Sequence, residues 1–100
     1  MTTETITTYI AGVRFRPGAA QRLRDIKAGT TLGLQREPGN KHDAFAVKVV
    51  SNGQHLGYVP RDYSMKVARA IDFGARVSCR TKGGWQQIAI SIDDSNLAAK

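Results

Sequence analysis

Residues 45–59, FAVKVVSNGQHLGYV, decide the fold class of this chain. Apolar side chains recur at every second position from Phe45 onward, which is the pattern of a half-buried β-strand. Asn52 and Gly53 follow, and this dipeptide is one of the strongest two-residue hairpin signals because both positions tolerate positive φ. A returning strand over residues 55–59 ends at Pro60, which cannot donate to a ladder. The stretch therefore predicts an antiparallel hairpin.

Further strands and two helices are expected on both sides of this hairpin. Alternation and β-branched residues predict strands over residues 5–15, 31–37, 75–81 and 85–92. Apolar residues at helical spacing predict short amphipathic helices over residues 18–27 and between Pro60 and Gly74. Parallel strands need crossovers of a dozen or more residues, which this chain cannot supply between its strands. We expect a mostly β fold, a small antiparallel barrel of about six strands with two short α-helices covering its ends.

The length of 100 residues and 10.9 kDa predicts one domain over residues 1–100, with residues 1–4 and 93–100 as loose tails. The longest unbroken apolar run has four residues, far short of the roughly 20 that span a bilayer. No secretory signal precedes the first strand, so a cytoplasmic protein is expected. Cys79 is the single cysteine, which excludes an intramolecular disulfide and a cysteine-rich zinc cluster.

Charge is the most informative part of the composition. The formal net charge is +7, and residues 5–92 carry fourteen basic and five acidic side chains. A surface of this kind attracts polyanions, and nucleic acid is the first candidate.

The usual signatures of an enzyme or a cofactor site are missing. The sequence has no phosphate-binding glycine-rich loop, no dinucleotide fingerprint and no metal-spaced histidine pair. His42 and Asp43 are compatible with general acid–base work, but turn residues of the loop 38–43 are the favoured interpretation. Cys79 shares the parity of the apolar Val77, so a buried, inert thiol is favoured over a nucleophile. We expect a non-catalytic protein without a cofactor or metal.

Two aromatic residues and one arginine have open interpretations. The parity of Trp85 opposes that of the later isoleucines, so its ring either faces solvent as a stacking platform or turns inward at a bulge. Phe15 lies between Arg14 and Arg16, an arrangement typical of single-strand binders, although a core position is favoured for Phe15 alone. Arg61 starts the second helix, where it either helps to hold a phosphate or is simply solvated.

Three motifs together resemble the HIRAN domain family: GVRF at residues 12–15, LQREPGNKHDAFAV at residues 34–47 and LGYVPR at residues 56–61. This family occurs in helicase-like DNA-repair ATPases and as short stand-alone proteins of bacteria and phages. The resemblance implies an OB-like β-barrel that captures the 3′ end of single-stranded DNA. It implies these roles: Asp43 for the 3′-hydroxyl, His42 and Phe15 for the terminal bases, Arg14 and Arg61 for phosphates, Tyr58 as a pocket wall and Trp85 as a late aromatic. Arg16 belongs to the same DNA-binding segment, at a position where helicase-like members carry a second aromatic.

The leading hypothesis is therefore a DNA-binding module for a single-stranded 3′ end, in DNA repair, replication or phage DNA metabolism. Its expected partners are single-stranded DNA and a separate helicase, nuclease or other DNA-processing protein. The alternative is a protein-interaction adaptor with incidental nucleic-acid contact, and a small nuclease is a less favoured third hypothesis.

Overall fold

A computed structural model describes residues 3–82 and 86–97. The elements follow the order β1 (Thr3–Tyr9), η1 (Val13–Phe15), α1 (Ala19–Asp25), β2 (Thr31–Arg36), β3 (Val47–Ser51), β4 (Gln54–Tyr58), α2 (Arg61–Asp72), β5 (Arg76–Thr81) and β6 (Gln87–Asp93). Six strands and two α-helices in the expected order confirm the predicted fold class. The first and last strands along the chain, β1 and β6, extend to Thr3 and Asp93, beyond the limits expected from the sequence.

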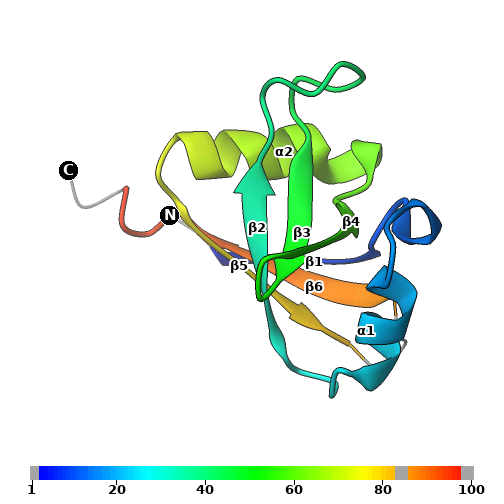
Figure 1. Ribbon diagram of the computed structural model, residues 1–100. Helices are drawn as coiled ribbons and strands as arrows, with labels where there is room; N and C mark the ends of the chain where they lie inside the picture. The colour runs from blue at the N-terminus through cyan, green and yellow to red at the C-terminus, as the bar shows by residue number, and fades with distance from the viewer. Residues whose placement is uncertain (1–2, 83–85, 98–100) are drawn as a thin grey trace.

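The strands form one antiparallel sheet in the order β1-β6-β5-β2-β3-β4, as Figure 1 shows. Its two edges meet just beyond β1. The backbone N–H of Ala11 donates to Tyr58 O at 2.8 Å, and the N–H of Tyr58 donates to Ala11 O at 2.9 Å. This isolated bridge links the edges into the barrel-like, OB-like shape that was predicted.

Gly57 makes this close approach possible. A Cβ at residue 57 would lie 2.4 Å from Ala11 O and 2.6 Å from Ile10 Cγ2, and its φ is 153°. Only glycine fits at this bridge. The hairpin turn before it is also as predicted, since Asn52 and Gly53 have φ angles of 48° and 82°.

The core lies between the inner face of the sheet and the two helices. Ile88 and Ile90 of β6, Leu56 of β4 and Val67 of α2 are fully buried. Helix α2 packs against β5 and β3, while α1 packs against β4, and Figure 1 shows α2 at the top of the barrel and α1 at its lower right. Apolar burial of this kind is the main favourable term in the folding of such a small domain.

Cys79 is buried in this core, as predicted. Burial raises the pKa of its thiol to about 12. The thiolate, which is the nucleophilic form, is therefore disfavoured.

Neither α1 nor α2, the two α-helices among the described residues, has the length and apolar character that a membrane-spanning helix needs.

The single strand predicted over residues 5–15 is wrong beyond Tyr9. Gly12 adopts a left-handed conformation with φ 74°, and a 3-10 turn follows over Val13–Phe15. The chain therefore reverses its direction and loses strand parity. As a result Val13 is buried, whereas Phe15 is 68% exposed, so the core position favoured for Phe15 is also wrong.

Candidate nucleic-acid interface

A cavity of about 210 Å³ opens between the loop of residues 37–46, the end of β4 and the start of α2. We call it the Asp43 cavity. The residues that line it are Ala11, Asn40, His42, Asp43, Ala46, Tyr58, Val59 and Arg61. Four of the residues expected to bind DNA, namely His42, Asp43, Tyr58 and Arg61, are thus brought to one place.

Asn40 shapes the loop from within. Its side-chain Oδ1 accepts hydrogen bonds from the backbone N–H of His42 at 2.8 Å and of Asp43 at 3.0 Å. This is the local side-chain capping that makes asparagine a turn former. Consecutive residues on a strand would point to opposite faces, but in this loop both His42 and Asp43 line the cavity.

Asp43 is half-buried, and both of its carboxylate oxygens are held. Oδ1 accepts the backbone N–H of Phe45 at 2.8 Å, and Oδ2 accepts the hydroxyl of Ser64 at 2.9 Å. Since each carboxylate oxygen can accept about two hydrogen bonds, the group keeps acceptor capacity for a ligand.

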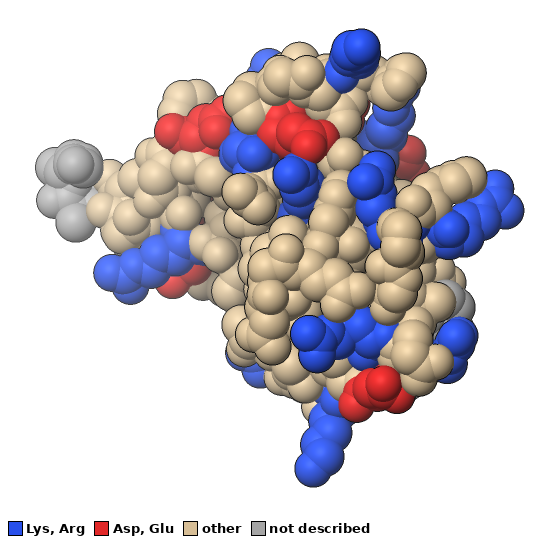
Figure 2. Space-filling view, viewed as in Figure 1, with Lys and Arg blue, Asp and Glu red and all other residues tan. Residues whose placement is uncertain are grey.

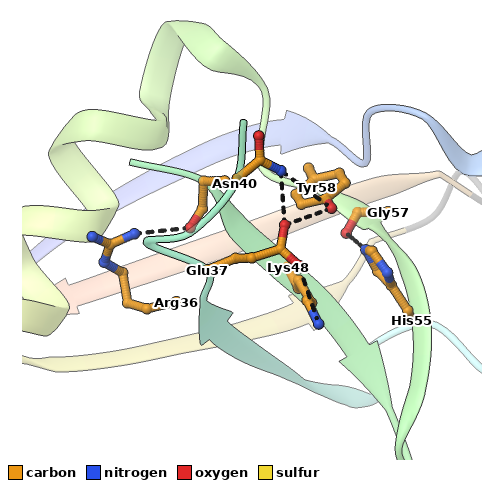
Figure 3. Close-up of polar contacts among 8 residues, drawn as sticks. Arg36, Glu37, Asn40, Lys48, His55, Gly57 and Tyr58 are labelled. Carbon is orange, nitrogen blue, oxygen red and sulfur yellow. Dashed lines mark hydrogen bonds and ion pairs between the residues drawn. The ribbon is translucent and has the colours of Figure 1, made fainter. Parts of the chain in front are cut away.

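Glu37 anchors the opposite side of the loop, as Figure 3 shows. Its Oε1 accepts from Asn40 Nδ2 at 2.7 Å and from the Tyr58 hydroxyl at 2.7 Å, and Lys48 Nζ lies 3.3 Å from Oε2. The hydrogen bonds from Asn40, Tyr58 and Lys48 lower the pKa of Glu37 from 4.5 to about 2. The carboxylate is therefore charged throughout the neutral range, and it fixes two cavity residues without lining the cavity itself.

The Tyr58 ring is held from two further directions. His55 meets it edge-on, with ring centroids 4.8 Å apart, and His55 Nε2 contacts Gly57 O at 3.0 Å. Burial and the charge of Arg16 lower the pKa of His55, which favours the neutral ring. The guanidinium of Arg16 lies over the Tyr58 ring, 5.7 Å from its centroid. Arg16 thus lies beside a wall of the Asp43 cavity.

Arg61 is exposed at the start of α2, and its guanidinium contacts the backbone carbonyl of His42. This contact and the bond between Ser64 and Asp43 join the first turn of α2 to the loop. Arg61 and Asp43 therefore line the same cavity, with the Arg61 guanidinium held at the backbone of the loop.

Arg14 and Phe15 belong to a second hollow of about 400 Å³, which we call the Phe15 cavity. Tyr9, Gly12 and Gln86 also line it, and it shares Ala11 with the Asp43 cavity. The Arg14 guanidinium lies 4.9 Å from the centroid of the Phe15 ring. An exposed ring beside a cation is the combination that stacks bases and neutralises phosphates. Trp85 lies outside the described residues.

Three residues for which the sequence suggested no binding role complete the arrangement: Glu37 and Asn40, both within the motif at residues 34–47, and Ser64. Asn40 had a weak signal as a turn former after Pro38 and Gly39. Ser64 had none, because its role depends on how α2 packs beside the loop.

Figure 2 shows Lys and Arg side chains spread over one face of the molecule, with fewer acidic groups among them.

A family model for the HIRAN domain matches residues 3–93. The chain belongs to the HIRAN domain family. Crystallography of the HIRAN domain of human HLTF gives a fold with a TM-score of 0.77 to this one, at 20% identity, covering 95% of this chain and 81% of that chain. A Lactobacillus plantarum protein of known structure gives a TM-score of 0.72 at 22% identity, covering 91% and 99% of the two chains.

A second HLTF structure is named for its DNA-bound conformation, and a sequence relative is named as a nuclease homolog. An NMR structure of the HLTF HIRAN domain in its DNA-bound conformation has a TM-score of 0.62 to this HIRAN domain, at 19% identity, covering 95% of this chain and 80% of that chain. A "Fanconi-associated nuclease 1 homolog" of Arabidopsis thaliana is 36% identical over 70 residues, which are 69% of this chain. The matched segment makes up 7% of that plant protein.

Proposed function

We propose that this HIRAN domain is a non-catalytic module that binds single-stranded DNA and captures its 3′-hydroxyl end. The observation that carries the proposal is the position of Asp43, a half-buried carboxylate in a cavity that Arg61 also lines, in a domain of net charge +7. A carboxylate repels a phosphate but accepts a hydrogen bond from a hydroxyl. A cavity built this way prefers the terminus of a strand to its interior.

The preceding nucleotides have a natural path away from this end. The Asp43 cavity and the Phe15 cavity share Ala11, so a strand that ends at Asp43 continues over Phe15 and Arg14. Arg14, Arg16 and Arg61 supply the positive charge along this path, and Phe15 and Tyr58 supply ring faces. In this proposal His42 packs on the terminal nucleotide.

The end-recognition step is tested with three single strands of one sequence, each carrying the same internal label. One ends in a 3′-hydroxyl, one in a 3′-phosphate and one is circular. A hydrogen bond to a charged group contributes about 1.5–3 kcal/mol, so we expect about tenfold or tighter binding of the 3′-hydroxyl strand by fluorescence anisotropy. Equal affinities for all three strands would contradict end recognition, even if DNA binding itself is observed.

The non-catalytic character is tested separately. Labelled single strands are incubated with the domain and Mg²⁺, and no shortened product is expected. Cleavage that disappears in Asp43→Asn would overturn this part of the proposal.

The proposed role is to present a DNA end to a DNA-processing protein in repair or replication. It is supported by the similarity to a segment of the much longer plant nuclease homolog. The helicase or nuclease that receives the end is then either a separate protein or another part of the same polypeptide. Pull-down of a candidate helicase or nuclease with and without a 3′-hydroxyl strand tests this role, and we expect capture that depends on the strand.

A protein-interaction adaptor is the second candidate, and one observation favours it. Phe73 is 73% exposed just after α2, at the end of the helix opposite Arg61. A docked protein at Phe73 would leave the Asp43 cavity open. Combined Arg14→Ala and Arg61→Ala changes separate the two functions, because they weaken DNA binding and leave an adaptor function intact.

A further inference from the structure

Ser64 lies in the first turn of α2, where its side chain is almost fully buried. It is 3% exposed, and its hydroxyl donates to Asp43 Oδ2 at 2.9 Å rather than bonding only within α2. The alternative acceptor in its own helix, Arg61 O, lies at the longer distance of 3.4 Å. The hydroxyl of Ser64 is therefore directed at the carboxylate that forms the centre of the proposed site.

Only two groups of the domain fix the Asp43 carboxylate among the described contacts. The Phe45 N–H belongs to the same loop and moves with it, whereas Ser64 belongs to α2 and is anchored by the buried core. Ser64 is thus the contact that sets the carboxylate relative to Arg61, which starts the same helix. A group held in place before the ligand arrives loses less entropy on binding.

We propose that Ser64 is a positioning residue that gives this site its preference for a 3′-hydroxyl over a 3′-phosphate. The inference rests on the proposed function. Ser64 acts through Asp43 and not on the DNA itself. Without the Ser64 hydroxyl, the Asp43 carboxylate still repels a phosphate. Its orientation, however, must be fixed each time a 3′-hydroxyl binds. The preference is therefore reduced, while binding to phosphates and bases continues.

The experiment compares Ser64→Ala with the unmodified domain on 3′-hydroxyl and 3′-phosphate strands. We expect the preference, measured as the dissociation constant of the 3′-phosphate strand divided by that of the 3′-hydroxyl strand, to fall by about threefold, through weaker binding of the 3′-hydroxyl strand alone. Ser78→Ala is the matched control, because Ser78 is exposed on β5 and lines none of the cavities described above. Thermal unfolding of each variant confirms that the domain is folded.

Two further variants separate positioning from a general structural effect. In an Asp43→Asn background, Ser64→Ala is expected to change the ratio no further. Ser64→Thr keeps the hydroxyl and is expected to keep the preference. Equal weakening on both strands, an additional effect in the Asp43→Asn background, or loss of preference in folded Ser64→Thr would each overturn the role of Ser64.

The outcome for the unmodified domain distinguishes this inference from the proposed function. If the unmodified domain binds both strands equally, end recognition itself fails and the role of Ser64 fails with it. If the unmodified domain prefers the 3′-hydroxyl strand and Ser64→Ala retains that preference in full, end recognition stands and only the positioning role is wrong.

Discussion

The Tyr58 hydroxyl donates a hydrogen bond to Glu37 Oε1 at 2.7 Å, and this bond joins β4 to the loop after β2. Asn40 donates to the same oxygen, so one carboxylate organises both a wall of the Asp43 cavity and the turn that presents Asp43. The carboxylate of Glu37 thus bonds to groups of the domain itself. Its removal is expected to disturb the Asp43 cavity, although Glu37 does not line that cavity.

Glu37→Gln tests this expectation. Glutamine keeps an acceptor oxygen but loses the charge, and hydrogen bonds to charged groups contribute about 1.5–3 kcal/mol. We expect a lower free energy of unfolding by about 1–2 kcal/mol and weaker binding of a 3′-hydroxyl strand. Asp25→Asn is the control with the same charge change, because the hydrogen bond of Asp25 within the described residues is a local one, from Gln21 on α1. If Asp25→Asn lowers stability and affinity as much as Glu37→Gln does, the network around Glu37 has no special role.

The same carboxylate predicts how stability depends on pH. The folded pKa of Glu37 is about 2, below its ordinary value of 4.5, because Asn40, Tyr58 and Lys48 donate to it. A lowered folded pKa contributes stability that is fully present above pH 4.5 and is lost as the pH falls toward 2. Urea unfolding between pH 6 and pH 2 is expected to show this decline, and Glu37→Gln is expected to flatten it. A decline of equal size in both proteins would mean that other groups cause it.

Gly57→Ala tests the closure of the barrel. The new Cβ would lie 2.4 Å from Ala11 O, so the bridge between Ala11 and Tyr58 must open or shift. We expect destabilisation of about 2–4 kcal/mol by chemical denaturation. Gly39→Ala is the control, because a Cβ there meets nothing within 4 Å and Gly39 has no positive φ. Equal midpoints for both variants would show that the bridge does not hold the fold together.

The strands were largely predictable because their signals are local. Alternation placed Ile88, Ile90 and Cys79 on the buried face, and Asn52-Gly53 fixed the hairpin. The segment after Tyr9 was not predictable in this way. Residues that favour strands continue past the point where Gly12 reverses the chain. Propensity describes single residues, and one left-handed glycine overrides it.

The site was predictable only in part, for a related reason. Its loop residues His42 and Asp43 lie together in sequence, and the family resemblance identified them. Ser64 contributes through its contact with Asp43, and Glu37 through its contact with Tyr58. The partners in each contact are 21 residues apart in the sequence. No spacing rule joins residues that meet only after the barrel has formed.

Asp43→Asn is expected to remove the preference for a 3′-hydroxyl end. The amide no longer repels a phosphate, so binding of a 3′-phosphate strand becomes tighter while binding of a 3′-hydroxyl strand becomes weaker. Asp62→Asn makes the same charge change on the exposed side of α2 and lines none of the cavities described above. Fluorescence anisotropy with both strands gives the ratio of the two dissociation constants for each variant. A similar loss of preference in Asp62→Asn would mean that net charge, and not the Asp43 cavity, decides the outcome.

The double variant with Arg14→Ala and Arg61→Ala is expected to bind single-stranded DNA more weakly, whatever the DNA sequence. The salt dependence of its binding is expected to change as well. Each neutralised phosphate contributes about −0.7 to the slope of log K against log salt for single strands. If each arginine neutralises one phosphate, the slope becomes shallower by about 1.4. The matched control removes two cations that line none of the cavities described above, Lys27 and Arg80. A control that flattens the slope while the Arg14 and Arg61 variant leaves it unchanged would place the DNA on the α1 and β5 side of the barrel, away from Asp43.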